Sequence, residues 1–168
     1  MKIIIISSLL GGFLSGFFKL GWEILLPPRT PIRNETNPPQ YLLQQFGFSK
    51  EFTHSYFTFS NQRIQYISLI MHFCFSIFFS FVYVASVNHV PVISVGQGTL
   101  YGFIIWIIFH LLIMPIMKTV PSISEQPLSE HFSELLGHII WGFVIQICYI
   151  ICYNYSLTPL INTHQKKK

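Results

Sequence analysis

Residues 64–117 read IQYISLIMHFCFSIFFSFVYVASVNHVPVISVGQGTLYGFIIWIIFHLLIMPIM, and these 54 residues include no Lys, Arg, Asp or Glu. A helix that crosses a bilayer needs roughly 20 apolar residues, since the hydrocarbon core is about 30 Å thick and a helix rises about 1.5 Å per residue. The stretch is long enough for two such helices. Asn88, His89 and Pro91 interrupt it with a turn signature. We therefore predict membrane spans at about residues 64–87 and 95–117.

Two more apolar stretches flank this region, one at about residues 3–26 and one at about residues 133–153. The chain has 168 residues, of which 51% are hydrophobic and only 10% are charged. A soluble domain usually carries about 25% charged residues. So few charges cannot make a water-facing surface, so lipid must cover much of this one. We predict an all-α fold, with residues 1–168 forming a single integral membrane bundle of about four transmembrane helices.

The loop between the first two spans, residues 27–63, begins at Pro27 and Pro28, which end the first helix. Its amphipathic stretch at residues 40–48 predicts that part of the loop lies at the membrane interface. Four spans put both termini on one side. Basic residues divide almost evenly between the two sides, and we place the termini in the cytoplasm. The tail of Lys166, Lys167 and Lys168 fits a membrane surface better than a nucleic-acid patch, so no nucleic-acid partner is expected.

A few ionisable residues interrupt the apolar spans. A charged side chain at mid-bilayer costs about 2.5–3.5 kcal/mol, so each of them needs a partner. Helical spacing places Lys19 and Glu23 one turn apart, and Glu134 and His138 likewise. Neighbouring spans run antiparallel, which brings all of these residues to the half of the membrane next to residues 27–63 and the third loop. We predict one shared polar cluster that consists of Lys19, Glu23, His72, His110, Glu134 and His138.

Two interpretations of this cluster stay open. Its ion pairs can simply hold the helices together. Alternatively, the cluster handles protons, because histidine titrates near pH 6.5 and a glutamate beside lysine or histidine can relay a proton. A metal site is chemically feasible, but no HxxxH spacing supports it, and we predict no metal and no cofactor. No nucleophile elbow, phosphate-binding loop or HExxH pattern is present in the sequence, so we expect no enzymatic activity.

Four short motifs follow one another within about residues 11–150. They contain Lys19, Leu20, Gly21, Trp22, Glu23, Pro27, Pro28, Arg29 and Pro31, then His72, Phe75 and Ser76, then His110, Met114 and Pro115, then Ser133, Glu134, Gly137, His138 and Trp141. In this order they resemble the motifs of the YagU-like bacterial inner-membrane proteins. The resemblance implies a multi-pass protein of the bacterial inner membrane with no established activity. It also implies that Pro27, Pro28 and Arg29 form a loop motif.

These observations lead to two functional hypotheses. The first is a non-enzymatic inner-membrane protein whose Lys/Glu/His cluster handles protons, in a role linked to acid or envelope stress. The alternative is a structural or scaffold membrane protein in which the cluster only locks the helix bundle. In both cases the lipid bilayer is a partner. Because one bundle of four helices buries little surface, we also expect a homo-oligomer, while any other protein partner is left open.

Overall fold

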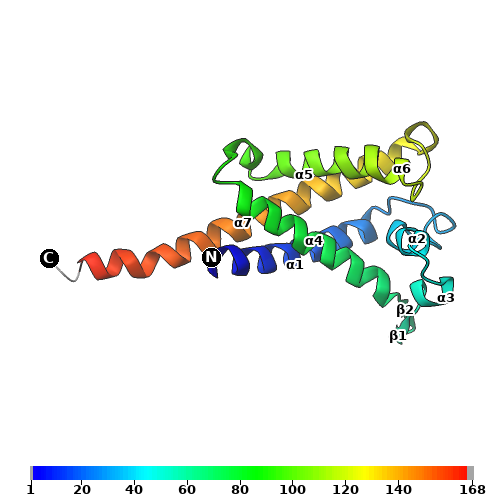
Figure 1. Ribbon diagram of the computed structural model, residues 1–168, viewed down its shortest axis with the longest axis horizontal. Helices are drawn as coiled ribbons and strands as arrows, with labels where there is room; N and C mark the ends of the chain where they lie inside the picture. The colour runs from blue at the N-terminus through cyan, green and yellow to red at the C-terminus, as the bar shows by residue number, and fades with distance from the viewer. Residues whose placement is uncertain (1, 166–168) are drawn as a thin grey trace.

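The computed structural model describes residues 2–165, and the side chains of residues 2–155. Within this part of the chain, four helical segments are long and apolar enough to cross a membrane: α1 (Lys2–Leu25), α4 (Tyr66–Ser86), the segment Thr99–Ile116, and the part Leu128–Tyr155 of α7 (Leu128–Gln165). The predicted all-α membrane bundle is confirmed. α1 begins and α7 ends toward the same end of the molecule (Figure 1). The tail of residues 166–168, which we expect at the membrane surface, lies outside the described residues.

The third membrane segment consists of three pieces, namely α5 (Thr99–Trp106), the π-helical η2 (Ile107–Ile113) and α6 (Met114–Ile116). A short 3-10 helix, η1 (Pro91–Ser94), precedes it. The segment begins later than residue 95 because Gly96, Gln97 and Gly98 have positive φ angles of 62°, 58° and 83°. Such angles belong to turns and not to right-handed helices. The π-helical turns come just before Pro115, which has no N–H to close an α-helical hydrogen bond.

The fourth span begins earlier than the predicted residue 133. Helix α7 starts at Leu128, and the Pro127 carbonyl oxygen accepts a hydrogen bond of 2.9 Å from the Glu130 N–H. The preceding loop contains a 3-10 turn, η3 (Ile123–Glu125). Glu130 and His131 therefore belong to the first turns of a membrane helix, whereas the sequence had placed them in a loop.

Glycines set how closely the helices approach. α1 lies against both α4 and α7, and α5 lies against α7. A Cβ atom at Gly12 would lie 2.4 Å from the Ile77 Cα, and one at Gly102 would lie 2.0 Å from the His138 carbonyl oxygen. Neither position can hold a larger residue at this helix spacing, which is how small residues drive helix association in membranes.

Aromatic side chains fill the interior between α4, α5 and α7. Tyr83, Tyr101 and Trp141 are at most 5% exposed, and the rings of the two tyrosines lie 4.8 Å apart. Ser76 joins three helices, since its Oγ donates to the Gly12 carbonyl oxygen (2.6 Å) and accepts from Trp141 Nε1 (2.7 Å). On its outer face α1 exposes large apolar side chains, as contact with lipid requires: Ile5, Ile6, Leu9, Leu10, Phe13 and Phe17.

Loop 1, the connection from α1 to α4, is folded. It contains α2 (Pro38–Gln45), α3 (Lys50–Thr53) and an antiparallel ribbon of β1 (Phe57–Phe59) and β2 (Gln62–Ile64). Helix α2 covers much of the predicted amphipathic stretch 40–48. Buried Gln40 donates from Nε2 to the Thr53 carbonyl oxygen (3.0 Å) and to Gln65 Oε1 (2.9 Å). The whole loop lies at the end of the bundle where α1 ends and α7 begins (Figure 1).

Candidate functional site

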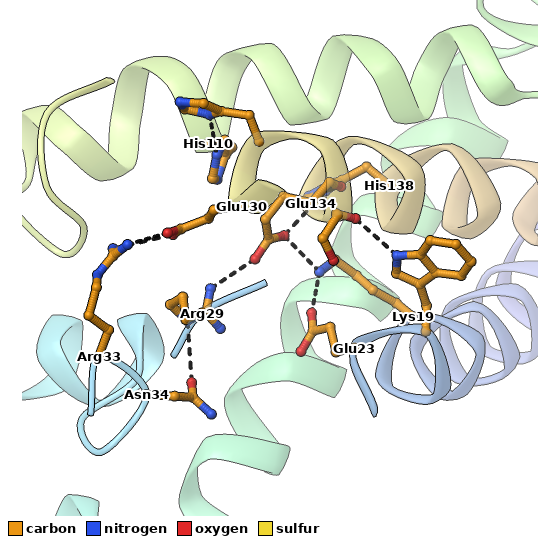
Figure 2. A network of polar contacts seen from close by, with 12 residues as sticks. Lys19, Glu23, Arg29, Arg33, Asn34, His110, Glu130, Glu134 and His138 are labelled. Carbon is orange, nitrogen blue, oxygen red and sulfur yellow. Dashed lines mark hydrogen bonds and ion pairs between the residues drawn. The ribbon is translucent and has the colours of Figure 1, made fainter. Parts of the chain in front are cut away.

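A buried carboxylate in the second turn of α7 is the centre of a group of charges. Glu134 is 6% exposed, and its two oxygens are held by cations from two different segments. Lys19 Nζ of α1 donates to Oε2 over 3.1 Å, and Arg29 Nη1 of loop 1 donates to Oε1 over 2.8 Å. Figure 2 shows the carboxylate between these two cations. Bonds from ionised donors to an ionised acceptor are the stronger kind of hydrogen bond.

Two further predicted residues complete this contact. The Lys19 ammonium also donates to the Glu23 carboxylate one turn along α1 (Figure 2). His138 Nδ1 lies 2.7 Å from the carbonyl oxygen of Glu134 and 3.7 Å from its Oε2. A carbonyl oxygen can only accept, so Nδ1 carries the proton. The structure thus brings Lys19, Glu23, Glu134 and His138 into direct contact.

A second ion pair lies one turn away and was missed in the sequence. Both Arg33 terminal nitrogens donate to the carboxylate of Glu130, which is fully buried (Figure 2). The signal was a matching spacing, because Arg29 and Arg33 are four residues apart, as are Glu130 and Glu134. We call the set of Lys19, Glu23, Arg29, Arg33, Glu130, Glu134 and His138 the ionic network.

The end of α1 is fastened to α7, and this positions the two arginines. Trp22 Nε1 donates to the Ser133 carbonyl oxygen over 3.0 Å, and the Ser133 hydroxyl donates to the Leu26 carbonyl oxygen over 2.5 Å. Pro27 and Pro28 then end the helix, with Pro28 buried. The predicted loop motif of Pro27, Pro28 and Arg29 therefore turns the chain back so that Arg29 reaches Glu134.

His72 lies beside the network with a partner of its own. Its Nε2 is 3.1 Å from the carbonyl oxygen of Gly16, one turn of α1 away from Lys19. The hydrogen bond joins α4 to α1. Among the described residues, no ion pair links His72 to the network.

His110 likewise has other partners than those predicted. It lies in the π-helical turns of the third span and is 1% exposed. Its ring stacks on Trp106, with ring centres 5.9 Å apart, and its Nε2 lies 2.9 Å from Nδ1 of His131 on α7. His131 was missed because the sequence had placed it in a loop. Of the six residues predicted to form one cluster, four are in direct contact. His72 and His110 lie at the border of this group and have other partners.

The formal charges of the ionic network balance. The cations Lys19, Arg29 and Arg33 face the carboxylates Glu23, Glu130 and Glu134. Within the described part of the chain, no three His, Cys, Asp or Glu side chains are placed to hold a metal ion. A balanced set of buried charges can hold α1, loop 1 and α7 together, and any added proton upsets its balance.

Comparison with known proteins agrees with the resemblance in the sequence. The profile of a family described as "Protein of unknown function (DUF1440)" matches residues 13–147, a range that includes the whole ionic network. The chain is 28% identical over 162 residues to "Inner membrane protein YagU" of Escherichia coli (strain K12), covering 83% of this chain and 79% of that relative. No solved structure matches the chain.

Proposed function

Because this chain belongs to the DUF1440 family and is a multi-pass inner membrane protein, we propose that it is a non-enzymatic protein that responds to protons. The responding parts are the ionic network and the neighbouring pair His110–His131. The observation that carries the proposal is the hydrogen bond between the buried His110 and the half-buried His131, beside a charge-balanced network. We place the response at the end of the bundle that carries loop 1, in a cell exposed to acid or envelope stress.

The His110–His131 pair has a geometry that one proton can change. His131 Nε2 lies 3.1 Å from the Ile123 carbonyl oxygen, so this nitrogen carries a proton. In the neutral ring Nδ1 then accepts, and His110 Nε2 is the donor. A proton added to His131 Nδ1 turns that acceptor into a donor. His110 must then change tautomer, or the hydrogen bond between the two helices breaks.

Protonation of the His110–His131 pair would act on the charges of the neighbouring ionic network. The charged or titratable groups that act on His110 are Glu134, His131, Lys19 and Arg29. A positive charge on either histidine is attracted by the Glu134 carboxylate and repelled by the two cations that share it. Acidification therefore weakens the attachment of Arg29 and loop 1 to α7.

A test uses the full-length protein in lipid nanodiscs, with the protease sensitivity of loop 1 measured from about pH 8 to about pH 5, a window that includes the histidine range. We expect the wild type to become more sensitive as the pH falls, and His110→Gln and His131→Gln to lose this dependence. His89→Gln removes an exposed histidine from the opposite end of the bundle and is the matched control. If all three variants respond like the wild type, the proposal is wrong.

A second measurement separates a proton sensor from a proton pathway. Proteoliposomes with an imposed pH gradient report proton flux, and His72→Ala and His138→Ala remove the two histidines that contact α1 and the network. Flux in the wild type that both variants abolish makes the protein a conductor. A loop response without flux makes it a sensor.

The alternative function, a structural lock, is favoured by the complete pairing of the network's charges. A lock predicts that network variants lose membrane abundance and that the remaining protein shows the same loop sensitivity at each pH. Proton response predicts that His131→Gln keeps its abundance and loses only the pH dependence. Quantifying membrane levels together with the protease assay distinguishes the two.

A further inference from the structure

A cavity of about 830 Å³ opens between loop 1 and the loop before α7. Four basic residues line it, namely Arg29, Arg33, Lys50 and Lys118, against two acidic ones, Glu35 and Glu125. The carboxylates of Glu134 and Glu130 on α7 pair with the two arginines from behind the lining (Figure 2). An anion in the cavity would therefore meet the remaining N–H groups of the arginines and the ammonium of Lys118.

The cations that line the cavity have N–H groups to spare. A guanidinium has five N–H donors, and both arginines use only some of them on their carboxylate and amide partners. The exposed Lys118 ammonium has no hydrogen bond or ion pair with any residue in the described part of the chain. Lys50 lies 3.9 Å from Glu35, and both side chains are mostly exposed. Lys118 is thus the cation with the most freedom to take a ligand.

An apolar groove of about 530 Å³ adjoins the cavity and shares Pro115 and Ser122 with it. Its apolar walls are formed by side chains that the protein leaves largely uncovered: Leu112 is 50% exposed, Ile116 77% and Ile123 47%. A phosphate or another small anion has no apolar part that could pack against the walls of this groove. A molecule that joins an anionic group to a hydrocarbon chain fits both parts.

The position of the cavity and the groove in the bundle is suited to an amphipathic ligand. Lys118 follows the third span, which ends at Ile116, and Arg29 follows the first span, which ends at Leu25. The cavity therefore lies at the level of the lipid headgroups, and the groove runs along the hydrocarbon side of the third span.

We propose that this cavity binds the phosphate of an anionic phospholipid, with one acyl chain of the same lipid in the groove beside Leu112 and Ile116. Basic pockets next to membrane helices are a known form of headgroup recognition. The cavity shares Arg29 and Arg33 with the ionic network. Lys118 and Leu112, which the test changes, belong neither to the network nor to the His110–His131 pair, so either proposal can fail alone.

Native mass spectrometry of the full-length protein in detergent tests the site. The protein is mixed with equal amounts of phosphatidylglycerol and phosphatidylcholine, and the retained lipid is measured. We expect phosphatidylglycerol to be retained preferentially, and Lys118→Gln to lower its retention about fivefold, the usual effect of one lysine near an anionic headgroup. Leu112→Trp, which fills the groove, should lower the retention of phosphatidylglycerol even though every charge is kept.

Arg63→Gln is the matched control, since it removes one positive charge from loop 1 at a residue that does not line the cavity and instead stacks on Tyr56. Its retention should equal that of the wild type. Equal loss in Arg63→Gln and Lys118→Gln would show unspecific charge attraction and overturn the proposal. Complete displacement of the lipid by millimolar inorganic phosphate would show a free-anion site and overturn it as well. Circular dichroism of each variant confirms that its helices are intact.

Discussion

Arg29 and Glu134 are 105 positions apart in the sequence, yet the Nη1 atom of the arginine lies 2.8 Å from the Oε1 atom of the carboxylate. This ion pair links loop 1, just after the first membrane helix, to the fourth membrane helix. Lys19 holds the other oxygen of the same carboxylate, so one side chain of α7 fixes both the end of α1 and the start of loop 1. Removing the Glu134 carboxylate must therefore affect both α1 and loop 1.

We expect Glu134→Gln to destabilise the protein by roughly 3–5 kcal/mol, because breaking a buried pair leaves its partners as uncompensated charges. Here those partners are Lys19 and Arg29, whose side chains are 12% and 10% exposed. The free energy of unfolding in micelles measures the effect. Glu35→Gln removes a 73% exposed carboxylate and should cost less than about 1 kcal/mol. Similar losses in the two variants would contradict a central role for Glu134.

Arg33→Lys tests the second pair. A guanidinium can donate two parallel hydrogen bonds to one carboxylate, whereas an ammonium cannot reproduce this geometry. Because Arg33 is 28% exposed and Glu130 fully buried, we expect a loss of about 1–2 kcal/mol in the attachment of loop 1. Amide hydrogen exchange in residues 27–40 should become faster. Arg63→Lys, at the exposed hairpin, should leave this exchange unchanged.

The membrane fold follows from the sequence because hydrocarbon excludes charge, and long charge-free runs are visible without a structure. The contacts Lys19–Glu23 and Glu134–His138 follow from helical spacing alone. The pair Arg33–Glu130 did not follow, because it depends on α7 beginning at Leu128. Apolar patterning locates the middle of a span better than its first turn.

The partner of His110 could not be found from the sequence for a different reason. The π-helical turns at Ile107–Ile113 rotate the residues of the third span relative to a regular α-helix. His110 thereby faces His131 and not the ionic network. Depth in the membrane was a sound guide to which residues gather at one end, but direction around each helix was not.

Gly102→Ala should destabilise the bundle by at least about 1–3 kcal/mol, the usual effect of overpacking. The added Cβ would lie 2.0 Å from the His138 carbonyl oxygen, so α5 and α7 must separate. Gly21→Ala is the control, since a Cβ there meets nothing within 4 Å. In a helix this change is neutral or stabilising by up to about 1 kcal/mol. A stable Gly102→Ala protein would mean that α5 and α7 do not pack at this distance.

The loop before α7 should keep its structure through the pH range in which histidines titrate. In its capping box the Ser122 hydroxyl and backbone N–H donate to the Glu125 carboxylate over 2.8 and 3.1 Å, and these hydrogen bonds lower the pKa of the carboxyl from its usual value. A group whose pKa is lowered by folding stabilises the folded state above its ordinary pKa, about 4.3, and this stabilisation is lost as the pH falls through the lowered value.

The Ser122 amide should therefore stay protected from exchange at about pH 5 and lose protection only below about pH 4. Glu125→Gln keeps an acceptor for the capping box but cannot titrate, so its protection should not depend on pH. Loss of protection already between about pH 7 and 5 in both proteins would show that another group opens this loop. If the wild type behaves as expected, a change of loop 1 in that range does not result from opening of the adjoining loop.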